Sequence, residues 1–446
     1  MQSAIASLTA LLIAAAILYA GNGLQGTLLA VRGAGEGFSA LIIGLVMSAY
    51  YTGFIVGCRV IPFVVRQVGH IRTFTAMASL ASAAALAHVL FIEPLAWMGL
   101  RIVTGFCFAG LAMVAESWIN NNATNANRGR VLSVYRVVDL SALMVGNLLL
   151  TVATPDGFTL FALVSILISV SLVPVALSRS EGPPPIQVTR LDLPQLFDVS
   201  PLAAVGVFIT GLSNTAFWAL GPYFAQSHGF DANGVALFMA VVILCGALSQ
   251  WPLGMVSDRV DRRFAILMTA TGGLGAGLSL FMGDAMPSFL LVGAAVFGLF
   301  SMPLFGLCVA LANDYAEADQ YVTVNGGLLL LYGIGAIIGP LAVPFVMAPL
   351  GSAGLFLFTA SAHGLLIVFG IYRILVRRPA APSEREDFFV VAPPQTTSPV
   401  AFEMDPRAPD LDEELAEPDQ ADQADQAEQQ DTSSAEPPPP SQAAVC

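Results

Sequence analysis

The sequence predicts an all-α integral membrane protein, with twelve transmembrane helices in two six-helix repeats and a disordered C-terminal tail. Three observations lead to this fold class. The 446 residues have a mean hydropathy of +0.74 and only 11% charged residues, whereas soluble proteins carry roughly 25%. The apolar residues form twelve long stretches. A polar break divides these stretches six and six, and small residues recur at one fixed spacing in both halves.

Each apolar stretch is long enough to cross a bilayer, which takes about 20 residues because every backbone polar group must be bonded within the helix. The first stretch lacks the basic residues with which a signal peptide begins, and it is longer than the apolar region of a signal peptide. We therefore expect it to be retained as the first span. In chain order, the expected spans are 5–30, 38–58, 73–92, 95–118, 131–153, 157–178, 201–225, 233–255, 264–283, 287–311, 322–347 and 353–376.

The longest internal polar segment, "SRSEGPPPIQVTRLDLPQLFDVSP", follows the sixth span, and its prolines and charges cannot continue a helix. We therefore expect a six-helix bundle at 1–178, a linker at 179–200, a second bundle at 201–378 and a tail at 379–446. Gly57 and Gly254 end spans two and eight, and Ala115 and Ala312 end spans four and ten. Both pairs lie 197 positions apart, which indicates a parallel internal repeat with a site between the halves.

Arginine positions predict the orientation, because the chain has 18 arginines and no lysine. Basic residues concentrate in short cytoplasmic loops. Ten arginines flank the even-numbered connections and three follow span twelve, whereas Arg32 alone marks the other side. We therefore expect both termini in the cytoplasm.

The net negative charge of the chain comes from its C-terminal tail. From Ala380 onward there are 16 acids and 2 arginines, whereas the preceding 379 residues hold 15 acids and 16 arginines. A charged, Pro- and Gln-rich segment with little to bury is typically disordered. The five cysteines show neither metal-ligand nor disulfide spacing, and we expect no metal and no cofactor.

A loop motif supplies the family resemblance. "GMVSDRVDRR", Gly254 to Arg263, resembles the signature Gly-x-x-x-Asp-Arg-x-x-Arg-Arg of the major facilitator superfamily (MFS). "AESW" followed by "NRGRVLSVY" is similar to its YcaD-like bacterial branch. The resemblance covers about residues 1 to 378. It implies the MFS fold, membrane transport without enzymatic activity, and a bacterial inner (plasma) membrane location.

The sequence also departs from the family pattern. The equivalent loop of the first half has Ile61 where the second has Asp258, which puts its gating role in doubt. The family's Arg-x-x-x-Gly motif is matched by Arg101 and Gly105 in span four. The Gly-Pro motif of drug-proton antiporters is absent from span five, and "GAIIGPLAVP" stands in span eleven instead. This weakens a drug-antiporter assignment.

Polar residues within the spans are the candidate substrate ligands. A charge at a helix centre costs about 2.5–3.5 kcal/mol on insertion scales, so Arg101 either binds an anionic group or makes a structural contact. Polar and aromatic side chains also recur at helical spacing in spans one and seven. For these the alternative is helix–helix hydrogen bonding. The candidate substrate-binding residues are Asn22, Gln25, Arg101, Asn214, Trp218, Asn325 and Tyr332.

Asp139 is the acid placed deepest in any expected span, and Arg136 precedes it by one turn. Asp139 is therefore the candidate for proton coupling, together with Arg136. The alternative is a local ion pair near the cytoplasmic surface.

Glu116 ends span four, and we expect it to form a gating or anchoring ion pair with Arg59, Arg66 or Arg128. In the second half, Asp314 ends span ten near the signature loop, where we expect it to lie close to an arginine. The remaining gating candidates are Gly254, Asp258, Arg259, Arg262 and Arg263.

Together these features predict a secondary transporter that moves a small organic solute by alternating access, with protons as the candidate coupling ion. The alternative is a transporter-like sensor or scaffold that binds a ligand without moving it. We expect a monomer in the lipid bilayer that binds a small molecule, alone or with a proton, and no nucleic acid.

Overall fold

The computed structural model describes residues 2–123, 128–176, 183, 193–283, 286–317, 320–376, 388 and 396–404. Contacts divide the chain into Met1–Pro406 and Arg407–Cys446, and all described residues belong to the first unit. The side chain of Arg128 and the tail beyond Met404 lie outside the described part.

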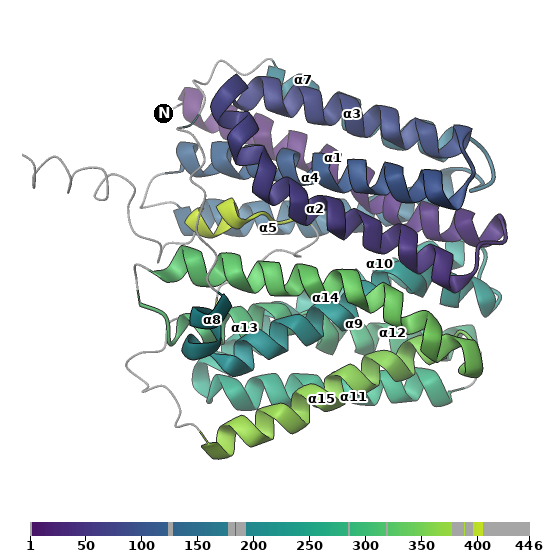
Figure 1. The fold of residues 1–446 in the computed structure, drawn as a ribbon, viewed down its shortest axis with the longest axis vertical. Helices are drawn as coiled ribbons and strands as arrows, with labels where there is room; N and C mark the ends of the chain where they lie inside the picture. The colour runs from purple at the N-terminus through teal and green to yellow at the C-terminus, as the bar shows by residue number, and fades with distance from the viewer. Residues whose placement is uncertain are drawn as a thin grey trace, which may run out of the picture. The chain divides into compact units, whose positions relative to one another are not determined.

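Helices make up both halves of the chain (Figure 1). Within the described residues, twelve helical segments are long and apolar enough to cross a membrane, which confirms the predicted number. The first half contains α1 (Gln2–Gly35), α2 (Ala40–Val68), α3 (His70–Leu90), α4 (Pro94–Asn122), α5 (Arg128–Leu148), η1 (Leu149–Val152), α6 (Thr159–Val170) and α7 (Leu172–Ala176). The second contains α9 (Pro201–Ser227), α10 (Ala232–Arg259), α11 (Arg262–Met282), α12 (Pro287–Ser301), α13 (Leu304–Asn313), α14 (Tyr321–Leu350) and α15 (Gly354–Val376), preceded by α8 (Leu193–Val199).

Local sequence signals set several helix ends. Asp231 caps α10 by accepting a hydrogen bond from the Gly234 amide at 2.8 Å. Gly69 turns the chain between α2 and α3 with a φ of 85°, a region that favours glycine. Pro303 stands where span ten is divided into α12 and α13, consistent with the missing donor of proline.

The two halves pack alike. α1 packs on α5, α2 on α4 and α3 on α6, and the second half repeats these pairs as α9 with α14, α10 with α12 and α11 with α15. The halves meet through α2 with α14, α5 with α10 and α1 with α9. This arrangement agrees with the parallel repeat expected from the 197-residue spacing.

Small residues bring the helix backbones into contact. A Cβ atom at Gly105 of α4 would collide with the Tyr50 carbonyl oxygen of α2. A Cβ atom at Gly146 of α5 would collide in the same way with Ala20 of α1. Such close approach is typical of helices that associate within lipid.

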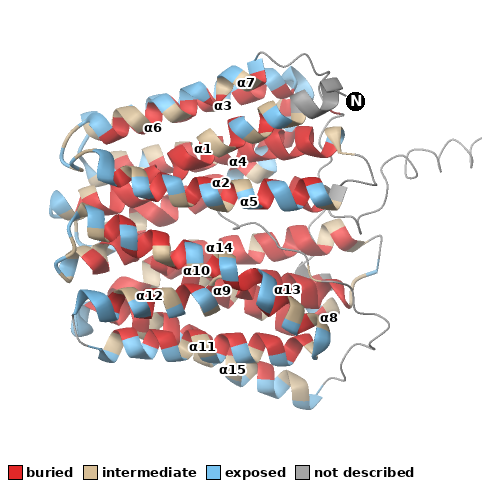
Figure 2. Cartoon of the chain, turned by 180° about the vertical axis from the view of Figure 1, so that it is seen from behind, coloured by how far each residue is buried: buried red, intermediate tan, exposed pale blue. Residues whose placement is uncertain are grey.

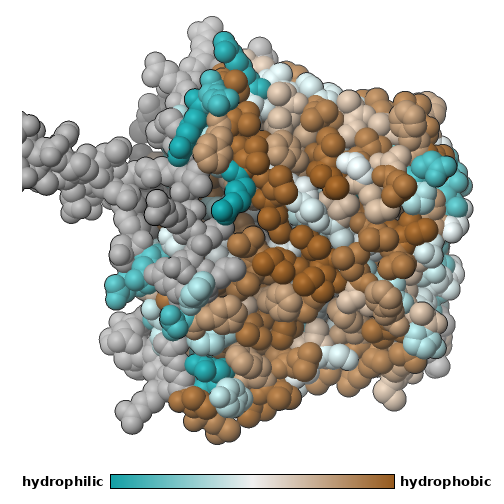
Figure 3. Space-filling model, in the orientation of Figure 1, coloured by the Kyte–Doolittle hydropathy of each residue, from teal (hydrophilic) through white to brown (hydrophobic). Residues whose placement is uncertain are grey.

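The outer faces are apolar, as lipid requires. Figure 2 shows the exposed residues on the outward sides of the helices, and in Figure 3 the visible face is mainly hydrophobic over the helices. Leu248, Phe345 and Leu375 are 67%, 70% and 80% exposed. An apolar surface of this kind marks contact with a membrane.

The tail segment, defined as Thr396–Met404, differs from the sequence expectation. The predicted tail began at residue 379, but the 3₁₀ helix η4 (Pro399–Met404) packs against α4, α5 and α14. The physical reason is visible in the sequence, because no charged residue occurs from Phe388 to Phe402. This stretch can be buried, unlike the acidic sequence around it.

We predict that Gly105→Ala destabilises the protein, because the added methyl group meets backbone rather than a movable side chain. Overpacking of this kind costs about 1–3 kcal/mol. Thermal unfolding of the detergent-purified protein measures the effect. Gly99→Ala on the same helix is the control, since a Cβ atom there has no neighbour within 4 Å. Equal melting temperatures for the two variants would contradict the close-packing argument.

Candidate functional site

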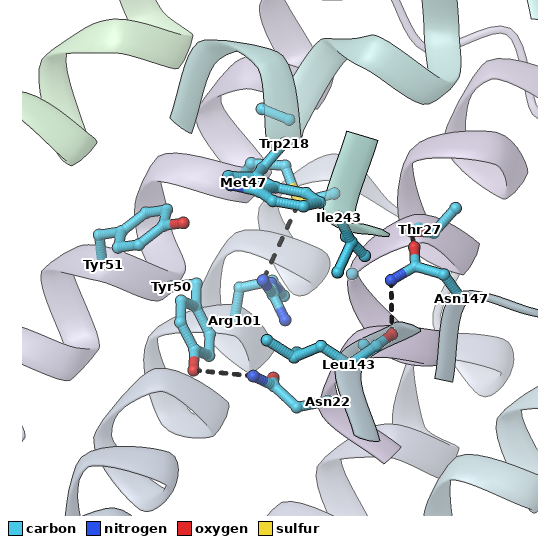
Figure 4. A pocket seen from close by; sticks show the side chains of 13 residues that line it. Asn22, Thr27, Met47, Tyr50, Tyr51, Arg101, Leu143, Asn147, Trp218 and Ile243 are labelled. Carbon is cyan, nitrogen blue, oxygen red and sulfur yellow. Dashed lines mark hydrogen bonds between the residues drawn. The ribbon is translucent and has the colours of Figure 1, made fainter. Parts of the chain in front are cut away.

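A cavity of about 60 Å³ lies between the two halves (Figure 4). Helices α1, α2, α4 and α5 contribute from the first half, and α9 and α10 from the second. One water needs roughly 10–15 Å³, so the cavity holds a few waters and is too small for an organic solute. Its lining residues are Asn22, Gly23, Gly26, Thr27, Met47, Tyr50, Tyr51, Arg101, Leu143, Asn147, Trp218, Ala219 and Ile243.

Arg101 is the charged residue of this cavity, and it is only 4% exposed. Its guanidinium carbon lies 4.4 Å from the ring centroid of Tyr50, and Nη2 lies 3.9 Å from Met47 Sδ. Within the described structure, Nε and Nη1 have no hydrogen-bond partner. The cation is therefore held by a ring and a sulfur while part of its donor set remains unused.

Amide side chains line the opposite wall. Asn22 Nδ2 donates to Tyr50 Oη at 3.5 Å, and Asn147 Nδ2 donates to the Leu143 carbonyl at 2.8 Å. Thr27 Oγ1 donates to Asn147 Oδ1. The close approach of α1 and α5 at Gly23 brings these groups together, because a Cβ atom there would press on the Leu143 backbone.

Three of the seven predicted substrate residues, Asn22, Arg101 and Trp218, line the cavity, and four do not. Asn214 accepts a hydrogen bond from Ser301 Oγ at 2.7 Å, and Asn325 donates to the Tyr321 carbonyl at 2.9 Å. The Tyr332 ring packs 5.3 Å from that of Phe305. Gln25 is fully buried, and its amide atoms have no partner in the described residues.

Sequence reasoning missed Tyr50 and Met47 of α2, and Asn147 of α5. Tyr50 and Met47 lie in an apolar span where aromatic and sulfur side chains are ordinary packing residues. Asn147 carried a usable signal, because it is an uncharged polar residue within the apolar run "MVGNLLL".

A second buried polar cluster contains two carboxylates. Glu116 of α4 and Asp139 of α5 are both 0% exposed. Tyr135 Oη donates to Glu116 Oε1 at 3.4 Å and lies 2.7 Å from Tyr19 Oη. Arg136 interacts electrostatically with both acids, while its Nε and Nη1 have no hydrogen-bond partner within the described structure. Its guanidinium carbon lies 5.1 Å from the Tyr135 ring centroid.

The tail segment supplies further partners of these acids. Thr396 Oγ1 donates to Asp139 Oδ2 at 2.8 Å. Ser398 donates to Glu116 Oε2 through both its amide, at 3.0 Å, and its hydroxyl. Both carboxylates are thus hydrogen-bonded by hydroxyl groups from a segment more than 250 residues away.

The third expected partner of Glu116, Arg128, has its side chain outside the described residues, so the ion pair of Glu116 stays a prediction. The described hydrogen bonds of Glu116 are not with Arg59 or Arg66. Both arginines are exposed, whereas Glu116 is fully buried among Tyr135 and Ser398. A buried carboxylate needs partners that reach it inside the bundle.

The signature loop forms a compact ion network in the second half. Arg262 Nε donates to Asp314 Oδ2 at 2.7 Å, and Arg262 Nη1 lies 3.1 Å from Asp258 Oδ1. Arg263 pairs with Asp261 at 2.6 Å, while Arg259 is exposed. Of the two acids that end the fourth span of each half, Asp314 therefore forms an ion pair with an arginine, whereas the described hydrogen bonds of Glu116 come from Tyr135 and Ser398.

Twelve spans in two matched halves around a central cavity define the class of secondary membrane transporters. A family model described as Major Facilitator Superfamily matches residues 203–406. The uncharacterized MFS-type transporter YcaD of Escherichia fergusonii is 26% identical over 329 residues, covering 73% of this chain and 85% of that protein. An MFS-type transporter of Yersinia pestis (strain Pestoides F) is 26% identical over 345 residues, covering 76% and 86%.

Solved structures show the same fold. The nucleoside transporter NupG superposes with a TM-score of 0.71 at 11% identity, covering 83% of this chain and all of that one. A bacterial homolog of the human lysosomal transporter Spinster gives 0.65 at 15% identity, covering 82% and 95%. The chain resembles the major facilitator superfamily over residues 203–406 and, over about three quarters of its length, the YcaD-like transporters. It is a multi-pass membrane transporter, not an enzyme.

We predict that Asp314→Asn lowers stability, because Arg262 is 1% exposed and would lose its closest carboxylate. Removing one partner of a buried pair costs about 3–5 kcal/mol when the remaining charge is left unpaired; because Asp258 still lies 3.1 Å from Arg262, we expect a loss below that range. Melting temperatures of purified variants report the change. Asp156→Asn is the control, since Asp156 faces Arg32 at 3.7 Å but is 84% exposed, and such surface pairs contribute little. A similar loss in both variants would show that burial does not decide the effect.

Proposed function

We propose that the protein is a secondary active transporter that carries a small organic anion by alternating access, with protons as the coupling ion. The observation that carries the substrate class is the buried guanidinium of Arg101, which has unused donors in the cavity between the halves. Arginine presents a planar fork of donors that matches a carboxylate or phosphate group. An anionic substrate would satisfy this cation, and the amides opposite would bind its neutral polar groups.

The size of the cavity supports a moving mechanism. About 60 Å³ admits no organic solute, whereas ligand pockets occupy about 300–1,000 Å³. Binding therefore requires the halves to separate around Arg101 from one side. In repeat transporters such rocking exposes a central site to each side in turn.

Two buried acids favour proton coupling. Asp139 accepts a hydrogen bond from Thr396 through one oxygen, and its other oxygen, Oδ1, has no partner among the described residues. Ionisable groups within spans commonly act in proton relays. We assign the coupling proton to Asp139, with Glu116 and Arg136 adjusting its affinity.

The distribution of arginines favours an orientation in which the C-terminal tail lies on the cytoplasmic side of the membrane. The connections α2–α3 and α10–α11 carry Arg66, Arg72, Arg259 and Arg262. We propose that this side faces the cytoplasm with both termini, in agreement with the positive-inside rule.

A thermal-stability screen against small carboxylates and phosphates tests the substrate class. A ligand of the folded state raises its melting temperature. We expect Arg101→Gln to lower the binding affinity for the stabilising anion at least about tenfold, because hydrogen bonds to charged groups contribute about 1.5–3 kcal/mol. Arg130→Gln, an exposed site at the start of α5, is the control. Stabilisation by neutral compounds alone, unchanged in Arg101→Gln, would overturn the anion assignment.

Counterflow in proteoliposomes with the stabilising anion separates transport from sensing. Saturable exchange supports a transporter, whereas binding without exchange favours the sensor alternative.

Asp139→Asn tests the coupling. We expect this variant to lose accumulation driven by a pH gradient while keeping counterflow, because exchange of solute needs no net proton movement. Uptake and counterflow assays measure the two activities, with Asp156→Asn as the exposed control. Unchanged accumulation in Asp139→Asn would remove Asp139 from the coupling role.

A further inference from the structure

The tail segment, Thr396–Met404, lies between the two halves. Its helix η4 contacts α4 and α5 of the first half and α14 of the second. In Figure 1 this element lies beside α5, toward the end of the bundle where the N-terminus is marked. We call this the tail-side end, and the opposite end, where α1 ends and α2 begins, the far end.

The polar residues of the segment form hydrogen bonds with two buried acids, Asp139 and Glu116. Thr396 and Ser398 are 2% and 0% exposed, and their hydroxyl groups donate to Asp139 and Glu116. The Thr396 carbonyl accepts from Tyr19 Oη at 3.3 Å. Hydroxyl and amide donors thus meet carboxylate acceptors, and carboxylates without such partners would be costly to bury.

Apolar residues come next in the sequence of the segment. Val400, Ala401 and Phe402 are 2%, 1% and 4% exposed and belong to the hydrophobic core. Burying a Phe side chain contributes about 1.5–3 kcal/mol, so the segment has both a polar and an apolar reason to bind.

Phe388 makes a second contact with the bundle. Its amide donates to both oxygens of Asp258, at 3.1 and 3.2 Å. Its ring fills the space beside Gly254, where a Cβ atom would collide with it. The tail therefore engages the two residues that begin the signature loop pattern.

The far end is closed without the tail. Ser48 Oγ of α2 donates to the Ile337 carbonyl of α14 at 2.8 Å, and Gly44 approaches the Pro340 carbonyl closely. At the tail-side end, η4 lies between α14 and the pair α4 and α5. The segment thus stands where a solute would have to pass to reach the cavity from that side.

We propose that Thr396–Met404 is an internal plug, a ligand of the tail-side cleft that covers Glu116 and Asp139 and blocks access to the central cavity. This inference deepens the proposed transport function, because transport would require the plug to leave. The acids that would carry protons are also those that hold the plug, so release exposes them to water.

Thiol labelling in lipid nanodiscs tests the plug without any substrate. The five native cysteines are replaced by alanine in the full-length chain, and one reporter is introduced, either Thr397→Cys in the plug or Tyr19→Cys beneath it. A hydrophilic maleimide is the probe. We expect slow reaction at both positions, since both side chains are 0% exposed.

Phe402→Asp releases the plug, because a buried unpaired carboxylate costs several kcal/mol. We expect labelling of both reporters to rise at least about tenfold, which corresponds to 1.4 kcal/mol of lost binding. Phe91→Asp is the matched control, since Phe91 is 59% exposed beyond the end of α3, and it should leave both rates unchanged. If Phe402→Asp does not fold, Thr396→Val with Ser398→Ala removes the hydroxyl donors instead.

Fast labelling of the Thr397→Cys reporter, with the plug otherwise unaltered, would overturn the plug. Exposure of the Thr397→Cys reporter by Phe402→Asp, with the Tyr19→Cys reporter still shielded, would overturn its blocking role. Labelling as expected with no anion exchange in any variant would keep the plug and reject the transport proposal.

Discussion

Direct contact between helix backbones is the constraint on which the rest of the structure depends. In lipid there is little hydrophobic force between helices, so association requires close packing. Gly105 against Tyr50 fixes α4 to α2, and Gly146 against Ala20 fixes α5 to α1. The second half uses the same device, with Gly298 against Val242 and Gly339 against Leu212. These contacts determine how far apart the cavity walls stand.

The halves share a geometry but differ in chemistry. The first half holds the buried charges of its interior, Arg101, Glu116, Arg136 and Asp139, at the faces toward the cavity and the tail. The second half keeps its buried charges at the signature loop, where Arg262 donates to Asp314. An internal repeat thus supplies a symmetric frame, while the buried charges of the first half face the central cavity and the tail segment.

The sequence predicts most of the fold because lipid allows few solutions. Twelve apolar stretches can only be spans, and a fixed spacing of small residues reveals the repeat. Arg101, Asn22 and Trp218 were found because polar and bulky residues stand out in apolar helices. Tyr50 did not stand out, since its role depends on lying under a guanidinium from another helix. The partners of Glu116 were unpredictable for a stronger reason, because Ser398 is 282 positions away in a tail of biased composition.

The far-end closure has a consequence for the energetics of opening. The contacts described there are the close approach of Gly44 to Pro340 and one neutral hydrogen bond from Ser48. Dissolved salt screens interactions between charges, over about 8 Å at physiological ionic strength, and has little effect on neutral contacts of this kind. These two contacts between the halves should therefore contribute nearly the same free energy in dilute and in concentrated salt.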